Sequence, residues 1–276
     1  NVIFDGPGKT EFDLKYAIDE ISTKLKMKYV HSKNHTFDYG ISSKLYNVSP
    51  GSINPTDDAS IVNPLTIDTE RGLESAIFLS DVYDVNSKLS LNLGLRYSVY
   101  LGLGESTQRF YEENSPKTDA TLLSTEQYAN NEIFQTYQGL EYRLSGRYFL
   151  DPELSLKASL NRSFQFIHRL SNNTSASPTD AWKLSDNNIK PQEAIQASLG
   201  LFKNFNVTDY EVSLEGYYKK YENVLDYKVG ASFLLNERIE TEVLQGPGKS
   251  YGIEFLAKKN VGKLNGWFGY SYSRSF

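Results

Sequence analysis

A long stretch of alternating polar and apolar residues, 137–167, most constrains what this chain can fold into. Two alternating segments flank Asp151-Pro152-Glu153, a tight turn whose proline cannot join a hydrogen-bonded ladder. Because a period of two is typical of a β-strand with unlike faces, the stretch predicts a β-hairpin. One face of its first arm carries Leu140, Tyr142, Leu144, Gly146, Tyr148 and Leu150, and the other carries Glu141, Arg143, Ser145 and Arg147.

The length of the arms and the contrast between their faces favour a membrane barrel. Each arm has about 12–15 residues, against roughly 5–6 for an ordinary soluble strand. A bilayer is spanned by about 9–11 tilted strand residues and leaves no backbone group unpaired. Such strands therefore close into a barrel that is apolar outside and polar inside. A hairpin of a large soluble β-sandwich is the alternative.

The connections between the predicted strands alternate regularly between short turns and long loops. Outer-membrane barrels have short periplasmic turns and long extracellular loops, whereas a sandwich has no reason to separate the lengths by end. About ten or eleven strands follow from the pattern, and the segment 89–101 is apolar at every second position. The long loops are predicted at 47–70, 102–135, 168–192 and 223–249.

Composition excludes several other classes of protein. No run of 18 apolar residues occurs, which argues against a helical transmembrane protein. The absence of cysteine excludes thiolate metal sites and disulfide scaffolds. A formal net charge of −5 argues against a nucleic-acid partner. The aromatic content of 13% suits the interfacial girdles of a barrel, and it equally suits a carbohydrate-binding β-protein.

Several segments resemble the TonB-dependent outer-membrane receptor family. LESAIFLSDVYDVNSKLSLNLGLRYS is similar to the family's strand, turn and "GLRY" strand, and LEYRLSGRYFLDPELSLKASLNRSFQF is similar to the hairpin that follows. Tyr142 stands where the family usually has proline. Three further segments resemble the Bacteroidetes branch with its SusC-like transporters: SDNNIKPQEAIQASLGL, EVSLEGYYKKYENVLDYK and GPGKSYGIEFLAKKNVGKLNGWFGYSYSRS.

The resemblance implies an all-β transmembrane antiparallel barrel of the outer membrane. The family's barrel has 22 strands around an N-terminal plug, and a TonB contact lies on the periplasmic side. We therefore expect residues 1–276 to be part of one barrel domain that is truncated at both ends, with the plug outside this chain. Implied partners are outer-membrane lipid, the TonB complex through an N-terminal region outside this chain, and a SusD-like surface lipoprotein.

The sequence shows no pattern of a catalytic centre, a metal site or a cofactor site. His31 and His35 flank a predicted turn, where solvated side chains are expected rather than metal ligands. Aromatic residues of the long loops are hypothetical ligand contacts, since they can stack on a sugar or ring: Phe110, Tyr111, Tyr128 and an exposed Trp182. By alternation, the lumen-facing charges are Arg96, Glu141, Arg143, Arg147, Lys157, Glu211, Glu215, Lys219, Glu254 and Lys258.

The resemblance implies active uptake of a scarce nutrient rather than an enzymatic reaction. Glycan, siderophore, cobalamin and peptide all remain open as substrates. A barrel that does not transport, and that acts as a structural or docking subunit of a larger membrane complex, is the alternative. A soluble all-β binding protein is a third hypothesis, and extraction without detergent would support it.

Overall fold

The computed structural model describes residues 2–4, 12–56, 60–171, 180–205, 210–233 and 235–276. The segment Asp5-Gly6-Pro7-Gly8, whose composition predicts a turn, lies outside this part of the chain. The described residues form strands and two short 3-10 helices. No helix among the described residues is long and apolar enough to cross a membrane.

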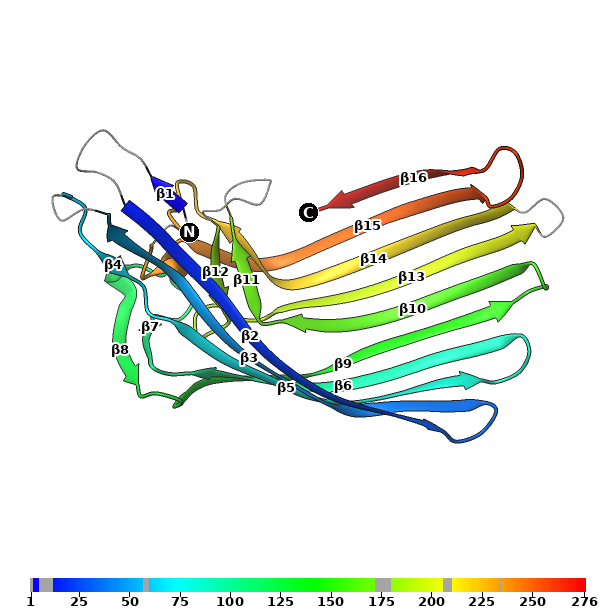
Figure 1. The fold of residues 1–276 in the computed structure, drawn as a ribbon, viewed down its shortest axis with the longest axis horizontal. Coiled ribbons are helices and arrows are strands. Elements are labelled where there is room, and N and C mark those ends of the chain that lie inside the picture. The colour runs from blue at the N-terminus through cyan, green and yellow to red at the C-terminus, as the bar shows by residue number, and fades with distance from the viewer. Residues whose placement is uncertain (1, 5–11, 57–59, 172–179, 206–209, 234) are drawn as a thin grey trace.

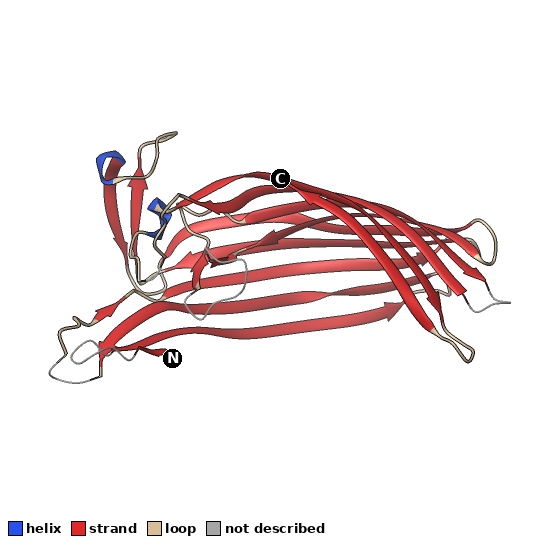
Figure 2. Cartoon of the chain, turned by 90° about the horizontal axis from the view of Figure 1, so that it is seen from above, coloured by secondary structure: helices blue, strands red, loops and turns tan. Residues whose placement is uncertain are grey.

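Ten long strands form the wall of the molecule. They pair antiparallel in the order β2-β3-β5-β6-β9-β10-β13-β14-β15-β16, and the sheet curves as an open strip (Figure 1; Figure 2). The predicted all-β antiparallel fold is therefore confirmed. The long strands are β2 (Phe12–Val30), β3 (His35–Pro55), β5 (Glu70–Asp84), β6 (Leu89–Leu103), β9 (Ile133–Phe149), β10 (Leu154–Gln165), β13 (Gln192–Phe205), β14 (Tyr210–Tyr227), β15 (Val243–Lys259) and β16 (Gly266–Ser275).

Short elements gather at one end of the strip, opposite the short turns (Figure 1). The strands β7 and β8 pair with each other, as do β11 and β12, while β1 and β4 lie beside β2 and β3. Their bounds are β1 (Val2–Phe4), β4 (Leu65–Thr66), β7 (Ser106–Tyr111), β8 (Leu122–Tyr128), β11 (Ile167–Leu170), β12 (Ala181–Leu184), η1 (Asp119–Thr121) and η2 (Ile239–Thr241).

The predicted long loops are shorter and more ordered than the sequence suggests. Two of them, 102–135 and 168–192, each contain a two-stranded hairpin. In the other two, β3, β14 and β15 continue well into the segments predicted as loops. The boundaries were wrong because polar residues break the alternation, although the backbone ladder continues beyond the apolar stretch of each strand.

The two faces of the strip differ as the alternation predicts. Residues opposite each other in an antiparallel register share a face. One such row runs Leu25, Ile41, Ile77, Tyr97 and Leu140 across five strands, and all five side chains are exposed. An exposed apolar surface of this extent is unusual for a soluble monomer and suits contact with lipid.

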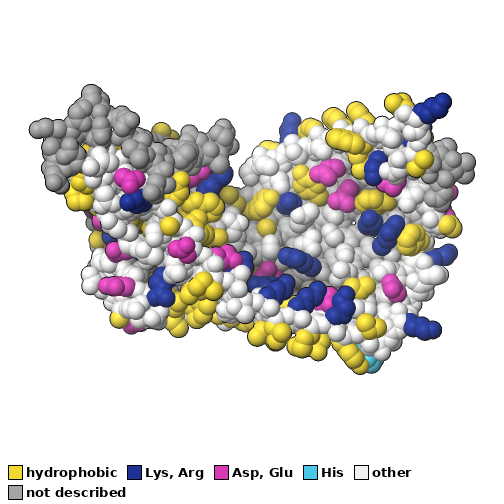
Figure 3. Space-filling view, in the orientation of Figure 1, with side chains coloured by type: hydrophobic (Ala, Val, Ile, Leu, Met, Phe, Trp, Pro, Cys, Tyr) yellow, Lys and Arg dark blue, Asp and Glu magenta, His cyan; other side chains and the backbone are white. Residues whose placement is uncertain are grey.

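The opposite face carries the charges. The register pairs Arg96 with Glu141 and Arg147 with Lys157, and it pairs Glu215 with Glu254 and Glu211 with Lys258. All ten predicted charges fall on this one face. In Figure 3, dark-blue and magenta side chains gather in the hollow between the two edges of the sheet.

Both long edges of the strip are open among the described residues. Beyond its pairing with β3, β2 pairs only with β1 at residues 12–14, and β16 pairs only with β15. An open edge in hydrocarbon leaves backbone groups without partners, at a cost of several kcal/mol each. Both edges therefore require strand partners before the sheet can lie within a membrane.

Candidate functional site

The segment between β10 and β13 folds back into the hollow of the sheet. We call its described part, residues 166–171 and 180–190, the inner hairpin. Its strands β11 and β12 pair antiparallel, with Ile167 opposite Leu184 and Leu170 opposite Ala181. The strand β12 packs against β3 and β5, and Figure 1 shows the pair between the two sides of the strip.

The inner hairpin is packed on both of its faces by apolar side chains. One cluster joins it to the wall through Phe166, Leu184 and the wall residues Tyr46, Val48 and Tyr100. The other cluster joins it to the connection between β14 and β15 and to that connection's ends: Leu170, Ala181, Ile189, Phe233, Ile239 and Val243. Burial on both sides removes most of the apolar surface from water, which holds the hairpin in place.

A buried lysine ties the inner hairpin to the wall. The Nζ atom of Lys183 lies 2.6 Å from Glu70 Oε1 and 2.7 Å from Asp186 Oδ2. Burial disfavours the charge of Lys183, but the two carboxylates outweigh it and raise its pKa above the ordinary value. The lysine is therefore charged at neutral pH and holds two segments together.

The partners of Lys183 are themselves fixed by backbone hydrogen bonds. The Leu184 amide donates to Glu70 Oε2 at 2.7 Å. The amides of Asn188 and Ile189 donate to Asp186 Oδ1 at 2.7 and 2.8 Å. Because both carboxylates are hydrogen-bonded and paired, this cluster satisfies the requirement for burying charge.

Wall tyrosines extend this polar contact. Tyr100 donates its hydroxyl to the Ser185 carbonyl at 3.1 Å, and Tyr137 donates to the Asp186 carbonyl at 2.7 Å. Each bond fixes the backbone that follows β12 against the wall. A buried hydrogen bond of this kind contributes about 0.5–1.5 kcal/mol.

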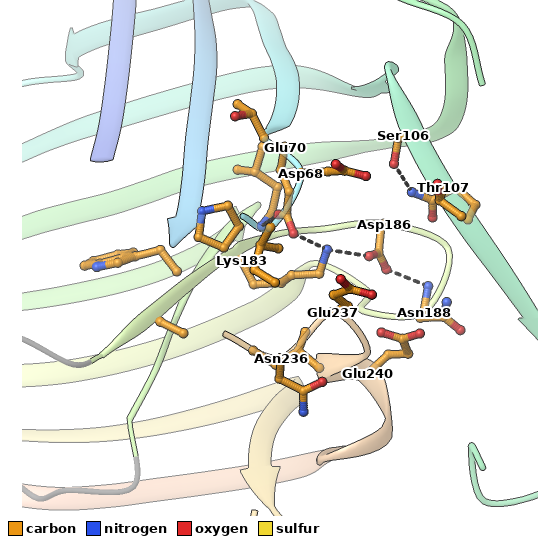
Figure 4. A pocket seen from close by; sticks show the side chains of 18 of the residues that line it. Asp68, Glu70, Ser106, Thr107, Lys183, Asp186, Asn188, Asn236, Glu237 and Glu240 are labelled. Atoms are coloured by element: carbon orange, nitrogen blue, oxygen red, sulfur yellow. Dashed lines mark hydrogen bonds and ion pairs between the residues drawn. The ribbon is translucent and has the colours of Figure 1, made fainter. Parts of the chain in front are cut away.

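A polar cavity of about 200 Å³ lies between the inner hairpin, the start of β5, β7 and the segment around η2. Figure 4 shows polar side chains from all four elements around it, with hydroxyls on β7 and mainly carboxylates and amides on the other three. The strand β7 is held beside the hairpin, since Asn187 Nδ2 and Asn188 Nδ2 donate to the Arg109 carbonyl at 2.8 and 2.9 Å. Its polar lining residues include Asp68, Glu70, Ser106, Thr107, Asn236, Glu237 and Glu240. Within the described chain no group of acidic or histidine side chains could hold a metal ion.

The predicted loop aromatics lie on two different hairpins. Trp182 lines the cavity, but it is half-buried against the wall cluster instead of exposed. Phe110 and Tyr111 lie on β7 and Tyr128 lies on β8, and none of the three lines the cavity. The Tyr111 hydroxyl donates to Glu240 Oε1 at 2.9 Å, so this side chain braces η2.

Among the predicted lumen-facing charges, Arg96 is the centre of a network in the wall. Its guanidinium lies 2.9 Å from Glu74 Oε1 and 3.2 Å from Glu141 Oε1. Ser98 donates to the same Glu141 carboxylate. Glu74 belongs to this network although the alternation did not single it out, because β5 is apolar on both sides in sequence. Arg147, in contrast, bonds Ser155, and Lys157 lies over the Phe202 ring at 3.9 Å.

Sequence reasoning missed Glu70, Lys183 and Asp186. In the sequence, Lys183 and Asp186 are ordinary charged residues of a polar loop, and Glu70 ends another. The contact between Lys183 and Glu70 joins positions 113 residues apart. No local spacing predicts a contact of that separation.

The model of the family described as "TonB dependent receptor-like, beta-barrel" matches residues 5–276. The chain belongs to this family. Its members are outer-membrane β-barrels, which agrees with the apolar face and the strands of the strip. The outer membrane is therefore the location of this barrel wall. No curated protein sequence matches the chain.

Solved structures of this family share the fold. The chain is similar to the FrpB iron transporter from Neisseria meningitidis (F3-3 variant), with a TM-score of 0.60 and 14% identity over 94% of this chain and 35% of that one. For the copper transporter OprC the TM-score is 0.62, with 12% identity over 96% of this chain and 39% of that one. For the pyoverdine receptor FpvA from Pseudomonas aeruginosa PAO1 the TM-score is 0.55, with 14% identity over 97% of this chain and 37% of that one. The chain thus spans little more than a third of these proteins.

Proposed function

We propose that this chain is part of a TonB-dependent receptor that takes up a scarce nutrient by energised active transport. The family match over residues 5–276 carries this proposal. The polar cavity beside the inner hairpin supports it, because it offers hydrogen-bonding groups at the end of the wall where the long connections lie. TonB would act through a region outside this chain. The described residues supply the barrel wall and the inner hairpin with its cavity, rather than any reaction chemistry.

We further propose that residues 1–276 form part of one barrel domain. Two open edges support this, since further strands must pair with β2 and β16 before the sheet can close in lipid. In such a barrel, the charged face of the strip would line the lumen and meet either a plug or a passing substrate. The ten charges from Arg96 to Lys258 would then set the polarity of that path.

Trp182 is the aromatic contact that we propose for the substrate. It lines the cavity, and an aromatic face contributes about 0.5–1.5 kcal/mol beyond its buried area when it stacks on a ring. Phe110, Tyr111 and Tyr128, on the neighbouring hairpin, remain predicted outer contacts. The segments 185–201, 211–228 and 246–275 support placement in the SusC-like Bacteroidetes branch, with a SusD-like lipoprotein as partner.

Uptake by cells that carry the full-length receptor tests the proposal. Labelled cobalamin, a ferric siderophore, an oligosaccharide and an oligopeptide are supplied to cells with and without TonB. We expect one of them to accumulate only in cells with TonB. Trp182→Ala is expected to weaken its binding up to about tenfold, whereas Trp182→Phe keeps most of the affinity.

Leu123→Ala on β8 is the matched control, because this side chain is 71% exposed and lies outside the cavity. It is expected to bind the probe as the unmodified receptor does. If TonB makes no difference to any of the four probes while the protein is present in the outer membrane, transport of these classes is refuted. The docking-subunit alternative would then take its place.

A further inference from the structure

His168 is a buried histidine in the middle of the inner hairpin. Its side chain is 1% exposed, and it lies on β11 directly opposite Lys183 on β12. The Nε2 atom lies 2.9 Å from Ser185 Oγ. The Nδ1 atom is buried without a hydrogen-bond partner. A second proton on this ring would thus find no acceptor.

The surroundings of His168 disfavour a positive charge. On the same face of the hairpin the neighbours are Lys183, which is charged, and the apolar Leu170 and Ala181. Asp186 is the nearby carboxylate, but Lys183 and two backbone amides already occupy its oxygens. The elements packed around the hairpin also carry titratable and charged groups. These are Tyr46 on β3, Glu70 on β5, Tyr100 on β6, Arg109 on β7, Lys117 before η1, Tyr137 on β9, Tyr227 on β14 and Glu240 in η2.

We propose that His168 makes the inner hairpin acid-sensitive, so that protonation of its ring releases β11 and β12 from the wall. The hairpin carries no disulfide, and its hold on the wall rests on one apolar cluster, one buried lysine and the hydrogen bonds from Tyr100 and Tyr137. The second apolar cluster joins it to the connection between β14 and β15. An uncompensated charge inside this packing is relieved when the hairpin swings out and water reaches the ring. This inference concerns the position of the hairpin and stands independently of what the receptor transports.

The direction follows from the affinity of each state for protons. Burial first, and Lys183 second, lower the pKa of His168 from 6.5 to about 4 in the packed hairpin. An exposed ring titrates near 6.5, so the released hairpin binds more protons below that pH. Release is therefore favoured progressively as the pH falls from about 6.5 to about 4. Linkage predicts about an eightfold shift toward the released state at pH 5.5 relative to pH 7, and about a hundredfold shift at pH 4.

Hydrogen exchange in the full-length receptor in detergent measures this equilibrium. The protection factors of the amides in β11 and β12 are corrected for the intrinsic pH dependence of exchange. Relative to pH 7, they should fall about eightfold at pH 5.5 and about a hundredfold at pH 4. Amides in the middle of β10, which pair with β9 and β13, provide the internal reference. In His168→Gln the fall between pH 7 and pH 5.5 should disappear, whatever the absolute protection of that variant.

Three controls separate His168 from other titrating groups. His31→Gln and His35→Gln alter the two other histidines and should keep the eightfold fall. Both lie where β2 turns into β3, and this turn is at the opposite end of the strip (Figure 1). Glu70→Gln should also keep it, because the ring remains. The proposal is overturned if unmodified protein shows no selective loss of protection by pH 5.5. It is equally overturned if His168→Gln shows the same loss.

Discussion

Replacing Lys183 by methionine is expected to destabilise the inner hairpin by about 3–5 kcal/mol. The side chain is similar in length, but its loss leaves the Glu70 and Asp186 carboxylates without the cation that lies within 2.7 Å of both. Removal of one partner of a buried ion pair has this large cost because an uncompensated charge remains. Hydrogen exchange at pH 7 should show the protection of β11 and β12 falling more than about a hundredfold.

An exposed ion pair supplies the matched control for Lys183. Lys220 lies 2.7 Å from Glu222, and both side chains are largely open to solvent. Lys220→Met should leave the protection of β11 and β12 close to that of the unmodified protein, since water replaces the lost partner. Adding Glu70→Gln and Asp186→Asn to Lys183→Met should restore part of the stability by removing the buried charges. Equal effects of the two lysine variants would show that Lys183 does not hold the hairpin.

Replacing Leu199 by arginine is expected to destabilise the barrel in a bilayer by about 2–4 kcal/mol. Leu199 lies in the middle of β13, on the apolar face, and is 55% exposed. In a membrane this side chain contacts the hydrocarbon, where an arginine loses its hydration. Denaturant unfolding of the full-length receptor in lipid vesicles measures the effect as a lower midpoint.

The adjacent position tests whether the effect depends on the face. Ser198 lies at the same depth on the charged face, where its hydroxyl is 2.9 Å from that of Ser159. Ser198→Arg should cost less than about 1 kcal/mol beyond the loss of this bond, because the new charge stays in the polar hollow. If both variants lower the midpoint equally, the assignment of the apolar face to lipid is wrong.

Most of the wall could be predicted from sequence. The alternation in 89–101 and in 140–150 predicted both the strands and their faces, since successive side chains of a strand point to opposite sides. The observed register places the predicted charges from Arg96 to Lys258 on one face. Prediction ended where periodicity ended, and this is why the continuation of β3 to Pro55 and of β14 to Tyr227 was missed.

The inner hairpin and its cavity could not be predicted in the same way. Trp182 was predicted to be an exposed loop aromatic, whereas its half-buried place beside the cavity depends on where the whole hairpin folds. Lys183 and His168 carry no local signal at all. Their importance comes from burial and from partners on β5 and in the turn after β12.

The sequence by itself determined the membrane wall of this protein, because a two-residue period and a lipid environment leave a strand little choice of face or partner type. Only the tertiary structure decided that the segment after β10 turns inward and meets Glu70. That choice rests on apolar clusters between segments far apart in the sequence and on an ion pair between positions 113 residues apart, and such long-range contacts leave no period in the chain.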